Sequence, residues 1–229
     1  MVKNKEMHRF LWLWLPLLAA VIQIFLELSL PVQTLSVLHS ESGPHELLQF
    51  LIISAALVVF ATMLLKIDIK QSPWLGAWVG IATLSCLYVA GEEISWGQHI
   101  MDWATPDYWK DMNDQGETNW HNTSSWLDQK PRLILEIGVI IGGLIIPFLM
   151  RVKPKALPER FLIIYPAGTL CITAGIFLIM KTIDKADVLG IQFFERGSEV
   201  QELYLFYFVL LYCLELRKRL ISKDAALKV

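Results

Sequence analysis

The stretch LLQFLIISAALVVFATMLL, from Leu47 to Leu65, contains no charged side chain. A helix rises about 1.5 Å per residue, so roughly 20 such residues cross a hydrocarbon core about 30 Å thick. This stretch therefore predicts a transmembrane helix. The rest of the chain agrees, because 55% of its 229 residues are hydrophobic and 18% are charged, whereas soluble domains carry about 25% charged residues.

Five further apolar segments of similar length lie on either side of this stretch. The six predicted spans are Phe10–Leu30, Leu47–Leu65, Trp74–Ala90, Leu133–Met150, Phe161–Met180 and Glu199–Leu216. The third is expected to run on as one helix to His99, since no Gly-Pro pair interrupts it. The first is longer than the roughly 7–15 apolar residues of a signal peptide, which predicts a retained span. The predicted fold is all-α: a single domain, residues 1–229, built as a six-helix membrane bundle.

The positive charges predict the orientation of this bundle. If the N-terminus is cytoplasmic, 14 of the 20 Lys and Arg residues fall on the cytoplasmic side and six fall outside. Cytoplasmic segments are enriched in Lys and Arg, so both termini are expected in the cytoplasm. All three cysteines lie inside predicted spans, which argues against an outer disulfide framework. Short loops without outer cysteines favour a bacterial inner membrane, and the net charge of −2 argues against nucleic acid as a partner.

Ionisable groups gather at the outer ends of the predicted spans. A charged side chain at the centre of a span costs about 3 kcal/mol or more, so such groups indicate function by default. The outer carboxylates are Glu27, Glu92, Glu93, Glu136, Glu199 and Glu202, and the outer histidines are His39, His45, His99 and His121.

Spacing arranges several of these groups in pairs. Glu92 and His99 are seven residues apart and would share one face of a continuous helix. Glu117 and His121 are four apart and would share a face if that piece is helical. After simpler roles are set aside, the candidate site residues are Glu92, His99, Glu117, His121, Glu136 and Glu202.

Two versions of the site stay open. Carboxylates and neutral imidazoles are ligands for Zn²⁺ and iron, and a buried carboxylate cluster needs a cation or shared protons. In the metal version, one ion of Zn²⁺ or iron is held by His99, His121 and either Glu136 or Glu92. The catalytic carboxylates are then drawn from Glu92, Glu117 and Glu202. In the other version, a Glu/His pair transfers protons without a metal.

Simpler roles account for the other polar groups. Glu199 follows Ser198 at a predicted helix start, where a carboxylate complements the N-terminus. His39 and His45 flank a loop-like Ser-Glu-Ser-Gly-Pro stretch and are read as solvated. Glu27 has Lys181 or Lys185 as candidate partners.

The connection Met101–Lys130 is 30 residues long, with a net charge of −4 and four tryptophans. Loops of this length are usually functional or disordered, and the aromatic content argues against disorder. One or two short amphipathic helices are expected here, lying on the outer membrane surface as a lid over the site.

No known sequence motif in this chain identifies the reaction that it would catalyse. Glu92-Glu93 at the end of a membrane helix resembles the paired glutamates of the intramembrane CAAX-type glutamate proteases, in which a Glu activates water. Gly97 stands where that motif has Arg, and no Phe-x-x-x-His follows. No Gly-x-Ser-x-Gly elbow is present, which argues against a serine hydrolase.

The sequence thus predicts a membrane enzyme that hydrolyses or modifies a lipid or another amphipathic substrate at the outer leaflet. The alternative is a small transport, ion-binding, proton-binding or complex-subunit protein that uses the same carboxylates. Polar groups at the middle of the spans would favour transport. The predicted spans offer few such groups, which favours a one-sided site.

Overall fold

The computed structural model describes residues 7–40, 43–113, 116–120, 123–186, 190 and 193–227. Over these residues the chain is all-α, with helices and no strand. It divides into two compact units, one formed by residues 1–39 and 138–229 and the other by residues 40–137. The six-helix single domain stays a prediction.

Four helical stretches in the described part are long and apolar enough to cross a membrane: Phe10–Ser29, Pro44–Leu64, Pro73–Glu93 and Gln129–Val152. Only 17–33% of each apolar window is buried within the protein. Soluble proteins rarely expose apolar surface on this scale, so the chain has the character of a multi-pass membrane protein. The first four predicted spans are thereby confirmed as apolar helices.

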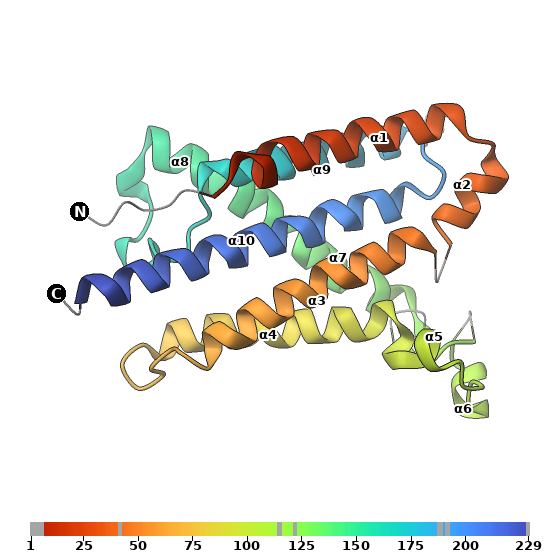
Figure 1. Cartoon of the computed structure of the whole chain (residues 1–229), viewed down its shortest axis with the longest axis horizontal. Coiled ribbons are helices and arrows are strands. Elements are labelled where there is room, and N and C mark those ends of the chain that lie inside the picture. Colours follow the sequence, from red (N-terminus) through yellow and green to blue (C-terminus); the bar gives the residue numbers. More distant parts are fainter. Residues whose placement is uncertain are drawn as a thin grey trace. The chain divides into compact units, whose positions relative to one another are not determined.

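The second unit is built on the pair α3 (Pro44–Leu64) and α4 (Pro73–Glu93), which lie side by side in Figure 1. The buried residues Ile53, Ala56, Phe60 and Met63 recur every three or four positions on α3 and so mark one face. A short turn carrying Lys66 and Lys70 joins the helices, which therefore run antiparallel. The start of α3 and the end of α4 consequently lie at the same end of the pair, far from that turn.

The first unit contains α1 (Leu15–Ser29), α2 (Val32–Leu38), α8 (Ile146–Val152), α9 (Cys171–Lys185) and α10 (Gly197–Leu227). Helix α9 packs on both α1 and α10. Helix α7 (Ser125–Ile140) begins in the second unit and ends in the first, so it links the two.

A π-helical turn precedes a proline in two of the spans. In the first, Phe10–Trp14, the Leu15 N–H donates to the carbonyl of Phe10 rather than to that of Leu11, and Pro16 has no N–H to offer. The Tyr207 hydroxyl of α10 donates to the Leu11 carbonyl at 2.6 Å. Helix α10 thus supplies a hydrogen bond that the first span does not make internally.

The second π-helical turn, Ile141–Ile145, precedes Pro147 in the same way. It contains Gly142 and Gly143, where the helix lies close to its neighbours. A Cβ at Gly143 would lie 2.7 Å from the Phe208 ring on α10 and closer still to the Ala174 Cβ on α9. The paired glycines therefore permit a close three-helix contact.

The third predicted span ends earlier than expected. Helix α4 stops at Glu93, and Ser95, Trp96 and Gly97 have positive φ angles of 46°, 54° and 107°. The expectation of one helix through His99 is therefore wrong, because left-handed backbone reverses the chain at this point.

The fifth and sixth predicted spans are not among the four. Pro166 lies within the expected fifth span, and α9 begins only at Cys171, so its 15 residues rise about 22 Å. Helix α10 is long enough but carries Glu199, Gln201 and Glu202 in its first turns.

Gly143→Ala is expected to lower the melting temperature of the detergent-solubilised protein, because the added methyl group has no room between Ala174 and Phe208. Overpacking of this kind lowers the free energy of unfolding by about 1–3 kcal/mol. Gly138→Ala in the same span is the matched control, because a Cβ there meets nothing within 4 Å. Equal melting temperatures for both variants would contradict the close contact.

Candidate functional site

The site begins where α4 ends. After Glu93 the left-handed residues turn the chain back, and the short helix α5 (Gln98–Met101) follows. The indole of Trp96 lies against Gly91, where a Cβ would come within 2.8 Å of the ring. The Trp96 Nε1–H donates to Glu92 at 2.7 Å. A glycine and a carboxylate one turn back thus hold the reversed chain on the helix end.

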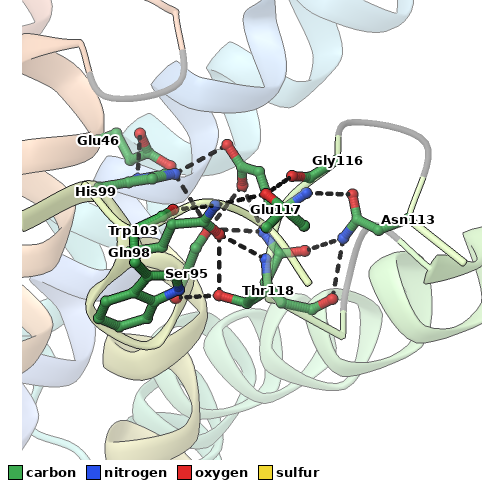
Figure 2. A network of polar contacts seen from close by, with 11 residues as sticks. Glu46, Ser95, Gln98, His99, Trp103, Asn113, Gly116, Glu117 and Thr118 are labelled. Atoms are coloured by element: carbon green, nitrogen blue, oxygen red, sulfur yellow. Dashed lines mark hydrogen bonds and ion pairs between the residues drawn. The ribbon is translucent and has the colours of Figure 1, made fainter. Parts of the chain in front are cut away.

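His99, Ser95 and Glu117 form a tight triangle at the centre of the polar network drawn in Figure 2. His99 Nε2 lies 2.9 Å from Glu117 Oε1 and 3.1 Å from Ser95 Oγ. The Ser95 hydroxyl donates to Glu117 Oε2 at 2.6 Å. Residues 22 positions apart in the chain therefore meet around one carboxylate.

Two asparagines complete the surroundings of Glu117. The Asn119 amide donates to Glu117 Oε2 at 2.7 Å and to Ser95 Oγ at 3.0 Å. The Asn113 amide donates to Asn119 Oδ1 at 2.8 Å, and its own oxygen accepts from the Glu117 backbone N–H at 3.2 Å. Ser95, Asn113 and Asn119 are all buried. These donors hold the Glu117 carboxylate in one position.

Gln98 ties the segment around Glu117 to α5. Its Oε1 accepts from the Thr118 backbone N–H at 2.8 Å and from the Thr118 hydroxyl at 2.9 Å. Its Nε2 donates to Thr105 Oγ1 at 2.7 Å, and Thr105 in turn donates to the Gly116 carbonyl. The segment is therefore anchored at both of its ends.

The hydrogen-bond directions indicate which nitrogen of His99 carries its proton. The single hydroxyl hydrogen of Ser95 goes to Glu117, so the Nε2 of His99 is the donor toward Glu117 and Ser95. In the neutral ring, Nδ1 is then the acceptor. Glu46, from the first turn of α3, approaches Nδ1 to 4.0 Å, which is an ion-pair distance but longer than a hydrogen bond.

The candidate residues meet only in part. His99 and Glu117 come together, although not through the helical spacings that singled them out. Residues 116–120 are not helical, and the expected helical pairing of Glu117 with His121 places one member outside the described residues. Glu92 lies beside the network, where it accepts from Trp96 and from the Trp120 backbone N–H at 2.7 Å.

The other two candidates occupy different places. Glu136 forms an ion pair with Arg132 at 3.4 Å, one turn back on α7. Glu202 lies on α10 in the first unit. Among the described residues no group of three His, Cys, Asp or Glu side chains is arranged to hold a metal ion. The metal version stays a prediction, and it depends on His121.

A second buried pair lies in the first unit, formed by His39 and Glu27. Nε2 of His39 is 3.2 Å from Glu27 Oε1, and both side chains are almost completely buried. Gln23 donates to the same carboxylate at 2.8 Å, and so does the Glu195 backbone N–H at 3.2 Å. The expectation that His39 is solvated is wrong, because the end of α2 turns it onto α1.

This pair joins the ends of several elements. Ser36 of α2 donates to Glu195 at 3.2 Å, while Arg196 has a positive φ of 53° and an ion pair with Glu199. Gln201 donates to Asp184 at the end of α9. This hydrogen bond joins the start of α10 to the end of α9.

Sequence reasoning missed most of the network. Glu46 was not among the candidates. Neither were the uncharged members of the network, which are Ser95, Gln98, Thr105, Asn113, Thr118 and Asn119. Two glycines with positive φ, Gly97 and Gly116, mark the turns on either side of this network. They were the available signal that the segment folds back.

No protein-family model matches this chain, and no match was found among curated proteins or solved structures.

Lowering the pH from 7.5 to 5.5 is expected to destabilise the wild-type protein more than His39→Gln. Burial, and then the Arg196 guanidinium, lower the pKa of His39 below its ordinary value of 6.5, and Glu195 opposes this less strongly. A histidine whose pKa is lower in the folded state destabilises the fold as the pH drops below 6.5, where the unfolded chain binds the proton first.

The measurement is the melting temperature of both proteins at the two pH values. All other titrating groups are shared, so the difference between the two pH effects reports on His39. An equal loss of melting temperature in both proteins would contradict this account.

Proposed function

We propose that this chain is a membrane enzyme in which His99 acts as a general base at the boundary of the bilayer, on a lipid or another amphipathic substrate. One observation carries the proposal: His99 is held by Glu117 at 2.9 Å while 13% of its side chain and 15% of that of Glu117 stay exposed. The pair is rigidly held yet reachable.

The hydrogen bonds suit such a role. A carboxylate that accepts from one ring nitrogen orients the imidazole and leaves the other nitrogen to accept a proton. Nδ1 would take the proton from a water or a substrate hydroxyl as that oxygen attacks an ester bond of the lipid; the ester bond breaks, and the imidazolium gives the proton to the departing oxygen. The resulting imidazolium would lie between two carboxylates, Glu117 and Glu46, which stabilise its charge. Ser95 is fully buried and donates to Glu117, so it is a positioning residue and not a nucleophile.

The backbone at the site supports the proposal. Three consecutive left-handed residues, two of them not glycine, are costly, and such strain is concentrated at functional sites. The surrounding hydrogen bonds offset this cost. A segment that only connected two spans would not require this conformation.

The position of the pair favours lipid as the substrate. It lies six residues beyond the end of the apolar helix α4 and beside the start of α3. Side chains with large exposed fractions follow in the same segment, including Trp96, Ile100, Met101 and Tyr108. Apolar and aromatic groups next to span ends are typical of the headgroup region.

The proposal includes the finer topology predicted from the sequence. In it the chain has six spans, both termini are cytoplasmic, and the site faces the outside of a bacterial inner membrane. The antiparallel α3–α4 pair supports this arrangement, because it places the turn with Lys66 and Lys70 at the opposite end from His99.

The test is lipid turnover by the purified protein in nanodiscs of mixed phospholipids, followed by mass spectrometry of the lipids. His99→Gln and Glu117→Gln are expected to lower turnover at least 100-fold, since general-base catalysis contributes about 10²–10⁴. Asp107→Asn is the matched control, a carboxylate in the same segment that is almost fully exposed. Turnover that persists in His99→Gln would contradict the proposal.

A further inference from the structure

The connection after α8 carries cations that the protein itself does not neutralise. Lys153 and Lys155 follow the span Gln129–Val152 directly, and Arg151 lies in its last turn. All three are exposed. Within the described ranges none of the three forms an ion pair, and the one acidic residue of this connection, Glu159, is exposed as well.

Several other cations of the described chain are paired with acids. Arg219 donates to Glu215 at 2.9 Å, Arg132 pairs with Glu136, and Lys110 pairs with Asp107. Each of these three cations is paired with an acid one turn away on the same helix. The cations of the connection are left facing outward.

The connection is folded and not a loose loop. Two short 3₁₀ turns, Pro154–Ala156 and Glu159–Phe161, follow each other, and the Tyr165 hydroxyl donates to the Pro158 carbonyl at 3.1 Å. The Arg160 guanidinium lies 4.3 Å from the centre of the Phe161 ring. Prolines and these contacts hold the backbone of the connection in place before any ligand arrives.

The end of α10 is tied to the chain just after the connection. Arg219 also donates to the carbonyls of Ile163 and Tyr165, which fixes α10 to the chain just after the connection. Arg217 and Lys218 precede it on the same turn, and in the described part of the chain neither forms an ion pair.

We propose that Arg151, Lys153, Lys155 and Arg160 form a binding site for the phosphate of anionic phospholipids. The site adjoins a span end, so its cations lie at the depth of the headgroups of any membrane that holds this span. Exposed apolar residues on both sides, Val152 and Leu162, would contact the acyl chains of the same lipid. This inference does not depend on the His99–Glu117 pair.

The experiment is native mass spectrometry of the detergent-purified, delipidated protein titrated with dioleoyl-phosphatidylglycerol, with dioleoyl-phosphatidylcholine as the neutral reference. Lys153→Gln/Lys155→Gln is compared with Lys66→Gln/Lys70→Gln, which removes two exposed cations from the α3–α4 turn. Each cation close to an anionic lipid raises the binding affinity about fivefold. The first variant lacks two cations and is therefore expected to bind phosphatidylglycerol about 25-fold more weakly. The second variant is expected to bind like the wild type.

Melting temperatures check that both variants fold, which is expected because the side chains are exposed. Unchanged phosphatidylglycerol binding in Lys153→Gln/Lys155→Gln would overturn the proposal, and so would an equal loss in both variants, which would indicate a diffuse effect of charge. A parallel titration in glycerol 3-phosphate distinguishes a lipid site from a site for soluble phosphate. Displacement of the lipid by millimolar glycerol 3-phosphate would overturn the assignment to lipid.

Discussion

The Glu117 carboxylate is the group on which the candidate site depends. It accepts from Ser95, His99 and Asn119, and through them it holds the end of α4 against a segment more than twenty residues further along the chain. Burying part of a carboxylate is unfavourable unless several donors surround it. Three donors from two segments meet that requirement only when the chain reverses after Glu93. The left-handed turn brings the donors to the carboxylate, and the hydrogen bonds to the carboxylate stabilise the turn.

The first unit also buries a carboxylate, that of Glu27, and surrounds it with hydrogen-bond donors. Glu27 lies near the end of the first span and is nearly inaccessible to solvent, and it receives hydrogen bonds from Gln23, His39 and the backbone of Glu195. In the described part of each unit, a carboxylate and a histidine thus pair at the end of the apolar helices. The pairs differ in access: the His39–Glu27 pair is closed, whereas the His99–Glu117 pair is partly exposed. That difference is the reason for assigning a chemical role to the second pair and a structural role to the first.

Much of the architecture could be predicted because it follows from local composition. Apolar length alone identified four of the spans, since roughly 20 uncharged residues have few alternatives to a membrane helix. The beginning of α9 was placed too early because hydropathy does not register Pro166, whose missing N–H ends helical pairing. The sequence predicts that the helix of the third span continues to His99, because an isolated glycine such as Gly97 does not by itself indicate a helix end. In the structure α4 ends at Glu93.

The site was harder to predict for a physical reason. Spacing rules apply within one continuous helix, and His99 and Glu117 meet through a folded connection. The residues that hold them, such as Ser95 and Asn119, are neutral and give no signal in a search for charged groups. His39 was misplaced for a similar reason, since a loop-like composition beside it concealed a tertiary contact with α1.

The most direct test of the account is the ¹⁵N NMR spectrum of His99 in nanodiscs, assigned by comparison with a His99→Gln sample. We expect the hydrogen of the neutral ring to be on Nε2, and the Nε2 resonance to shift when Glu117 is changed to Gln. A hydrogen on Nδ1, or a His99 spectrum that is unaffected by Glu117→Gln, would contradict the hydrogen bond on which the site rests.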